Sequence, residues 1–191
     1  MHTLLYRAAF APLLLLTSLS AQADTWVIDK DDSQVIFKYE YSGTPYQGAF
    51  TDIDATFDID PMNPGSCEFQ VTIDMDEIAI DDEETLSYLL DVDMFDVAQY
   101  PTASFEADEC SLLSANSFVA DGMLTIRNQT QPITFPFELD IDTSGDQLRF
   151  HMTSEVTIQR LEYGVGQGYL ANTSDIPNDV DVEVDVYAVM Q

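Results

Sequence analysis

Carboxylates in closely spaced pairs are the residues of this chain with the most evident chemical potential. Examples are Asp52 with Asp54, Asp91 with Asp93, and Asp179 with Asp181. Two carboxylates held in different environments can serve as general acid and as base or nucleophile, as in glycoside hydrolysis. The chain has 35 Asp and Glu among 191 residues, however, so such pairs arise by chance. A hydrolase or lyase that uses paired carboxylates therefore stays as an alternative and no catalytic residue is assigned.

The second chemical candidate is His151, the one histidine outside the first few residues. Histidine is the usual general base and a frequent zinc ligand, but zinc sites commonly need several. His151 shares the strand face of Arg149 and Glu155, opposite Phe150 and Met152. This position favours a surface residue.

The segment Asp140–Asp146 resembles the first half of a calcium-binding loop. His151 stands where such a loop needs a bidentate glutamate, and the segment separates two strand patterns. We therefore expect a hairpin turn and no metal site.

The first 23 residues have the pattern of a signal peptide. A short polar start with Arg7 precedes the apolar run Ala8–Leu16, and Ala21-Gln22-Ala23 is a small-x-small cleavage signal. The apolar run is too short for a membrane span, which takes roughly 20 residues. We expect residues 24–191 to form one exported domain, located in the periplasm and not integral to a membrane.

The formal net charge of −29 limits the possible partners. Removal of the leader would take away Arg7 and no acidic residue. Nucleic acids and anionic membrane surfaces both require Lys and Arg, so neither is expected to bind. Self-repulsion that keeps the protein soluble explains the charge most simply. An acidic cation-binding surface protein is a further alternative.

The two cysteines, Cys67 and Cys110, are expected to form a disulfide, since an even pair in an exported protein favours one. The bridge would close a loop of about 44 residues, which contributes about 4 kcal/mol in the chain-entropy model. Two free buried thiols are the alternative.

Apolar residues alternate with polar ones in about eight short segments, which is typical of strands with one buried face. The segments are residues 35–41, 53–59, 67–75, 103–107, 118–126, 133–139, 148–158 and 180–186. Strands of this length with turn signals between them predict a sandwich or a barrel. The acidic positions are expected to face outward, and a one-residue slip in register would bury them.

One segment, Asp81–Asp96, predicts a short helix instead. Asp81 or Asp82 can cap it, Glu83 and Glu84 suit its first turn, and leucines follow at helical spacing. The strand pattern resumes after Tyr100-Pro101.

Four blocks of the sequence resemble the YceI-like family of periplasmic polyisoprenoid-binding proteins. They are Asp29–Phe37 with Gly48–Ala55, Leu86–Asp96 with Tyr100–Phe105, Gly122–Ile133, and Ile158–Gly166. The resemblance covers essentially all of residues 24–190. The chain departs from the family pattern where Asp32 and Tyr41 stand at or near usual histidines. Asn128 replaces a usual glycine, Asp91 a usual serine, and basic residues around the helix are missing.

The resemblance implies an all-β fold, an eight-stranded antiparallel lipocalin-like barrel with one short helix between strands. It also implies an apolar cavity for an isoprenoid chain, such as a polyprenyl or quinone-like tail, or for another amphiphilic lipid. No other cofactor and no metal are expected, and the chain is expected to be a monomer or a homodimer.

The cavity-lining candidates follow from strand parity, and each could equally be plain core. They are Val35, Phe37, Tyr39, Phe57, Phe69, Val71, Phe105, Leu124, Ile126, Phe135, Phe137, Phe150 and Met152. Arg160, among glycines at alternate positions, is a further candidate. It would contact a ligand head group or form a structural ion pair with a nearby acid.

Overall fold

The structure, a computed structural model, describes residues 25–60 and 67–191. The expected signal peptide and its cleavage site lie outside these residues. The strands are β1 Thr25–Ile28, β2 Gln34–Tyr41, β3 Thr44–Phe50, β4 Ile53–Ile59, β5 Cys67–Asp74, β6 Ile78–Ala79, β7 Thr102–Ser114, β8 Ser117–Ile126, β9 Gln129–Asp142, β10 Arg149–Gln159 and β11 Asp179–Met190. The helical segments are α1 Glu83–Leu90 and the 3-10 turns η1 Lys30–Asp32, η2 Arg160–Tyr163 and η3 Gly168–Ala171.

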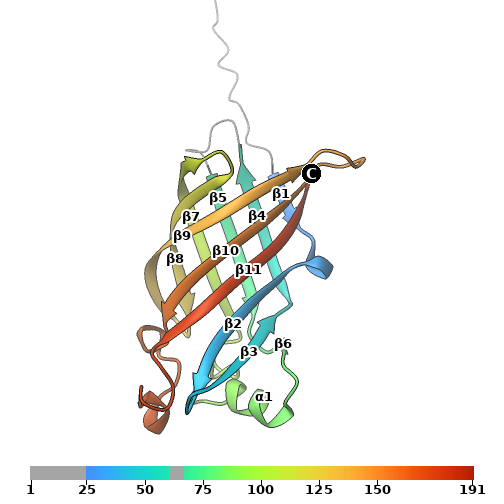
Figure 1. Ribbon diagram of the computed structural model, residues 1–191. Coiled ribbons are helices and arrows are strands. Elements are labelled where there is room, and N and C mark those ends of the chain that lie inside the picture. The colour runs from blue at the N-terminus through green and yellow to red at the C-terminus, as the bar shows by residue number, and fades with distance from the viewer. Residues whose placement is uncertain (1–24, 61–66) are drawn as a thin grey trace, which may run out of the picture.

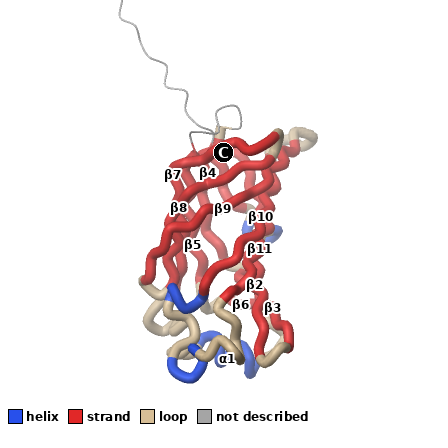
Figure 2. The backbone as a smooth tube through the Cα atoms, turned by 60° about the vertical axis from the view of Figure 1, so that its left-hand side comes forward, coloured by secondary structure: helices blue, strands red, loops and turns tan. Residues whose placement is uncertain are grey.

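Eight antiparallel strands close into a barrel, as predicted (Figures 1 and 2). The ring runs β1, β4, β5, β7, β8, β9, β10 and β11, and it closes because β1 pairs on both sides. Trp26 of β1 lies opposite Phe57 of β4 and opposite Met190 of β11. Closure removes the exposed edges of the ring.

The remaining strands extend one side of the barrel towards the end that carries α1. β2 pairs with the first part of β11, where Val35 lies opposite Val184, and β3 and β6 follow in order. β1 pairs with the last residues of β11 and β2 with its first part, both on the same edge. The 3-10 turn η1 separates β1 from β2. The sequence did not predict β1, β3 or β6. β3 reads Thr44-Pro-Tyr-Gln-Gly at its start and is largely exposed, so it shows no alternation.

The predicted direction of the strand faces is confirmed in β4. Ile53, Ala55, Phe57 and Ile59 are buried, while the residues between them are exposed or half-buried. The apolar residues therefore fill the barrel and Asp54 faces water, whereas Asp58 is half-buried.

The block Gly122–Ile133 contains the hairpin turn between β8 and β9. Its two-residue turn places Arg127 and Asn128 at φ values of 50° and 56°. Two successive positive φ angles are typical of a type I′ turn, which suits the twist of the strands. Asparagine tolerates this conformation, so Asn128 can occupy a position where glycine is usual.

The predicted helix is also confirmed. Asp82 caps α1 by accepting a hydrogen bond from the backbone N–H of Thr85 at 2.8 Å. Leu89 is the buried residue of the helix and faces the barrel interior. Together with η3, α1 lies at one end of the barrel, which we call the helix end (Figure 1).

The predicted disulfide links β5 to β7. Cys67 and Cys110 are bonded, their Cα atoms lie 5.8 Å apart, and both side chains are buried. They belong to a core cluster that fills the end of the barrel opposite α1, which we call the closed end. Trp26, Phe69 and Phe150 are almost fully buried in the same cluster.

Candidate functional site

Two apolar cavities lie inside the barrel. The one nearer the helix end measures about 120 Å³ and the inner one about 110 Å³. We call them the helix-end cavity and the inner cavity. They share the wall residues Val35, Ile73, Leu124, Ile158 and Val182. The two cavities are therefore neighbours along the barrel interior and share part of their walls.

Most of the parity-based candidates border these cavities. Val35 and Leu124 line both cavities. Phe37, Tyr39, Ile126 and Arg160 line the helix-end cavity. Phe57, Phe69, Val71, Phe105, Phe135 and Met152 line the inner cavity.

Phe137 and Phe150 border neither cavity, in contrast to the parity-based expectation. Phe150 packs against Trp26 and Phe57 with ring centroids 5.1 and 5.4 Å apart. Phe137 packs against Phe69 at 5.5 Å. Facing inward is not enough to line a cavity, because rings from several strands meet at the closed end and fill it.

An outer pocket of about 420 Å³, which we call the vestibule, adjoins the helix-end cavity. Tyr39, Leu89, Met94 and Ile176 border both spaces. The other residues of the vestibule are Tyr41, Tyr46, Asp82, Glu84, Thr85, Tyr88, Tyr169 and Leu170. Because aromatic rings fill the closed end, we call the vestibule the entrance of the barrel.

Sequence reasoning missed the part of the cavity wall that does not come from strands. Met75, Leu89, Met94, Phe95 and Tyr163 come from the helix and from turns, and all are buried around the helix-end cavity. Strand parity cannot detect such residues. Leu86, Leu89 and Leu90 at helical spacing were the available signal, since an apolar helix stripe needs a surface to cover.

Arg160 lies at the helix-end cavity with only 3% of its surface exposed. Its Nε donates to the carbonyl of Pro177, its Nη1 to those of Val165 and Gly166, and its Nη2 to those of Leu170 and Ile176. These bonds use all five N–H groups of a guanidinium. The expected ion pair with an acid is not made among the described residues, because backbone carbonyls take every donor.

The environment of Arg160 is apolar, and burial lowers the pKa of its guanidinium. An arginine nevertheless stays charged in a protein. A charge without an acidic partner needs every hydrogen bond it can make. Arg160 therefore organises the loop of residues 164–177 and has no N–H left for a ligand.

A second arginine that the sequence did not single out secures the segment after α1. Arg127, in the β8–β9 turn, donates to the carbonyls of Gly164 at 2.6 Å and Val92 at 3.1 Å, and also to Met94. Asp96 lies 3.8 Å from its guanidinium. The entrance of the barrel is thus built on two arginines that bind mainly backbone oxygens.

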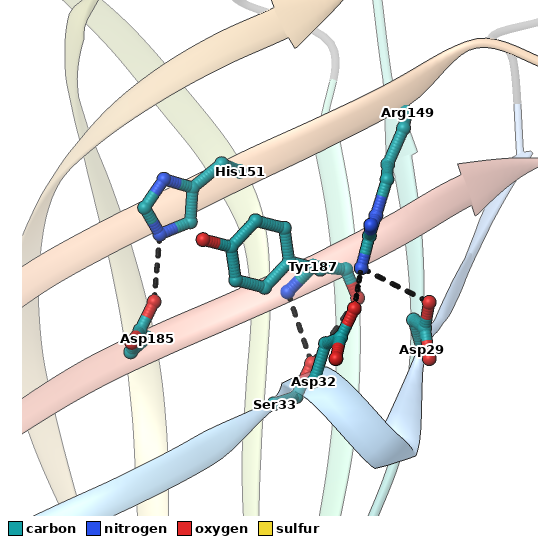
Figure 3. A network of polar contacts seen from close by, with 7 residues as sticks. All are labelled: Asp29, Asp32, Ser33, Arg149, His151, Asp185 and Tyr187. Atoms are coloured by element: carbon teal, nitrogen blue, oxygen red, sulfur yellow. Dashed lines mark hydrogen bonds and ion pairs between the residues drawn. The ribbon is translucent and has the colours of Figure 1, made fainter. Parts of the chain in front are cut away.

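His151 takes part in a polar network on the outside of the barrel (Figure 3). Its Nε2 lies 2.6 Å from Oδ1 of Asp185, and its ring stacks on Tyr187 at 4.2 Å. Arg149 lies over the other part of this network, 4.5 Å from the Tyr187 ring centroid, and pairs with Asp32 and Asp29. The network links η1 to β10 and β11.

The hydroxyl of Ser33 ties the end of η1 to the backbone of β11. Its hydroxyl accepts from the backbone N–H of Tyr187 at 2.9 Å and donates to the carbonyl of the same residue at 3.2 Å. Asp32, which stands at a usual histidine position, points to Arg149 on the outside and not to the cavity. The network holds strands together, and none of its members borders either cavity.

The described acidic residues lie outside the two apolar cavities and do not gather into a metal site. No group of three or more His, Cys, Asp or Glu within residues 25–60 and 67–191 is placed to hold a metal ion. Asp52 and Asp54 both pair with Lys30, at 2.9 and 2.7 Å. The segment expected to be a turn is one, and Asp142 accepts from the N–H of Ser144 at 2.8 Å within it. Neither apolar cavity has an acid among its described lining residues.

Comparison with known proteins identifies the class. The model of the YceI-like domain matches residues 26–188, so the chain belongs to the YceI-like family. A UPF0312 protein of Pseudomonas aeruginosa is 31% identical over 130 residues, which is 65% of this chain and 66% of the relative, just under two thirds. A UPF0312 protein of Yersinia pestis is 27% identical over 129 residues, covering 66% of this chain and 67% of the relative.

Solved structures show the same fold. BcnA of Burkholderia cenocepacia superposes with a TM-score of 0.76 at 24% identity, over 84% of this chain and 98% of that chain. A polyisoprenoid binding domain from Saccharophagus degradans, implicated in plant cell wall breakdown, superposes with a TM-score of 0.66 at 14% identity, over 89% of this chain and 99% of that chain. Among the described helices of the present chain, none has the length and apolar character of a membrane span.

Proposed function

We propose that this protein is an exported binding protein that holds the apolar tail of an isoprenoid-type or other amphiphilic lipid, as a carrier, store or sensor. The observation that carries the proposal is the pair of neighbouring apolar cavities, of which the helix-end cavity shares four wall residues with the vestibule. A tail in these cavities gains about 25 cal/mol for each Å² of apolar surface removed from water. The polyisoprenoid binding domain of Saccharophagus degradans, which shares the fold, supports the choice of ligand.

The size of the cavities adds a condition to this function. Both are smaller than the roughly 300 Å³ at which ligand pockets usually begin. A long tail must therefore displace side chains. Met75 and Met94 border the helix-end cavity and Met152 borders the inner one. Methionine is unbranched and flexible, so these side chains can move without breaking hydrogen bonds.

Export to the periplasm is part of the same proposal. Residues 1–23 have the pattern of a signal peptide. The bond between Cys67 and Cys110 supports an oxidising compartment, because disulfides persist there and are rare in the cytosol.

The alternative of a hydrolase or lyase requires two carboxylates beside a bound substrate. The described lining of the two cavities offers none, so no observation favours catalysis there. Calcium or another metal ion finds no group of three or more His, Cys, Asp or Glu ligands among the described residues.

Native mass spectrometry of the full chain, purified without detergent, tests the proposal. We expect an adduct with the mass of an isoprenoid-type lipid, or stoichiometric uptake of added geranylgeraniol. The exposed substitution Met123→Trp, on the outer face of β8, serves as a control that should not change uptake. Absence of both the adduct and the uptake would contradict lipid binding.

A further inference from the structure

An aromatic wall leads from the helix-end cavity to the vestibule. The rings of Phe37 and Tyr39 are stacked with centroids 6.1 Å apart, and those of Tyr39 and Tyr46 with centroids 5.5 Å apart. Phe37 is buried at the cavity, whereas 37% of Tyr46 is exposed. The wall therefore continues from the tail site to the solvent.

Three more tyrosines border the vestibule and remain exposed. Tyr41 belongs to β2, Tyr88 to α1 and Tyr169 to η3, with exposed fractions of 47%, 58% and 72%. The elements that carry them meet at the helix end (Figures 1 and 2). The face of a tyrosine ring is negative and attracts cations within about 6 Å, and several rings together form the cages that bind quaternary ammonium groups.

Two carboxylates complete the lining. Asp82 and Glu84, at the start of α1, both border the vestibule. Hydrogen bonds from the side chain and backbone of Thr85 lower the pKa of Asp82, so its carboxylate is charged at neutral pH. Burial raises the pKa of Tyr39, and the negative charge of Asp82 contributes to the same shift. Tyr46 contributes more to this shift than Asp82 does.

No positive side chain balances these carboxylates in the described part of the vestibule. Lys38 follows Phe37 on β2 but pairs with Glu183 on the outer face of the barrel. Arg160 lies behind Leu170 and Ile176 with every N–H bound to a carbonyl. A phosphate head group would find carboxylates and no free donor of charge-assisted hydrogen bonds.

We propose that the vestibule binds an organic ammonium head group, an amine or a quaternary ammonium, of an amphiphile whose tail lies in the cavities. This inference rests on the proposed function, and it names the head-group class that the entrance selects. The tyrosine rings supply cation–π contacts and the two carboxylates supply charge. Phosphate head groups are disfavoured at the same place.

Three probes with the same tail test this selection: dodecyltrimethylammonium, dodecanol and dodecyl phosphate. Each is titrated below its critical micelle concentration into the full chain and followed by native mass spectrometry and calorimetry. We expect the ammonium to bind roughly tenfold more tightly than the alcohol, within the range that cation–π contacts provide. The phosphate should bind most weakly.

Two variants with equal net charge separate the site from general attraction by an acidic protein. Glu84→Gln removes a carboxylate of the vestibule, whereas Glu83→Gln removes its neighbour in the same helical turn, which does not border the vestibule. We expect Glu84→Gln to lower the ratio of ammonium to alcohol association constants by about threefold or more, and Glu83→Gln to preserve it. Tyr46→Leu, which keeps an apolar wall, should lower the ratio as well.

The outcomes distinguish the two proposals. If dodecanol does not bind at all, lipid binding fails and the head-group site falls with it. If dodecanol binds but the ammonium is no tighter, or if Glu83→Gln and Glu84→Gln change the ratio equally, the head-group site alone is overturned.

Discussion

Arg160 and Gly166 fit together so closely that only glycine can occupy position 166. A Cβ atom there would overlap Nη1 of Arg160, and the residue has a φ of 80°. Nη1 also donates to the carbonyl of Gly166 at 3.4 Å. The glycine thus allows the loop of residues 164–177 to wrap around a buried guanidinium beside the cavity.

Gly166→Ala should destabilise the protein by roughly 2–4 kcal/mol, because it combines left-handed strain with loss of Arg160 hydrogen bonds. Urea unfolding measures the change. Gly145→Ala is the matched control, since a Cβ at position 145 meets no atom closer than 3.5 Å and φ there is not positive. Equal effects of the two substitutions would contradict the close fit.

Arg160→Lys should also destabilise, by roughly 2–4 kcal/mol, because one ammonium cannot serve five carbonyls and leaves some of them unpaired. Hydrogen exchange should increase in residues 164–177. Arg149→Lys changes a partly exposed arginine that pairs with Asp29 and Asp32, and it should cost less than about 1 kcal/mol. A loop that keeps its protection in Arg160→Lys would show that the carbonyl contacts are dispensable.

Replacement of both cysteines should lower stability at the closed end. The bond spans a sequence separation of 43 residues, which corresponds to about 4 kcal/mol of chain entropy. We expect Cys67→Ala/Cys110→Ala to unfold at a lower temperature than the oxidised protein. Reduced protein with both thiols present is the control, and it should behave similarly. If the oxidised protein is no more stable than the alanine variant or the reduced protein, the disulfide does not contribute to stability.

The resemblance to the YceI-like family supplied the barrel, since the strand pattern alone left a sandwich or a barrel open. The pattern did predict the long strands, because their apolar and polar residues alternate. β4 illustrates this, with Ile53 and Phe57 inside and Asp54 outside. The same pattern could not predict β1, a strand of four residues, because so short a segment carries no period. It also could not show which inward residues meet empty space, since that depends on rings from distant strands, as Phe150 and Trp26 demonstrate.

The role of Arg160 was beyond sequence reasoning for a related reason. Its partners are backbone oxygens, which every residue has, so no residue type in the sequence identifies them. The sequence signal for the loop around Arg160 was the pair of glycines at 164 and 166, and both have positive φ. The tyrosines of the vestibule were visible singly, but the fold brings together β2, α1 and η3 from distant parts of the chain.

The cap of α1 predicts a dependence of stability on acid. Hydrogen bonds from Thr85 hold the pKa of Asp82 below its ordinary value in the folded state. The carboxylate therefore stabilises the fold above its unfolded-state pKa, near pH 4, and this contribution is lost as pH falls through the folded-state pKa. Asp82→Ala should be less stable than the parent at neutral pH, and the difference should shrink in acid. Asp81→Ala is the control, and a pH-independent gap for Asp82→Ala would contradict the cap.

Leu124 borders both cavities, so a large side chain there should divide the path between them. Leu124→Trp should reduce binding of geranylgeraniol more than binding of dodecanol, because only the longer tail must pass into the inner cavity. Each methylene of the longer tail that stays outside the inner cavity costs about 0.8 kcal/mol of binding free energy. Two such methylenes correspond to a roughly tenfold lower affinity for geranylgeraniol.

Calorimetric titration of both alcohols measures this ratio, and Met123→Trp, on the exposed face of the same strand, controls for the added ring. Overpacking should cost Leu124→Trp about 1–3 kcal/mol of stability, so folding is checked by circular dichroism before titration. Equal loss of both alcohols would mean that the two cavities do not act as one path. A selective loss of the longer tail would locate that tail across Leu124 and give the order in which the cavities fill, from the helix end inward.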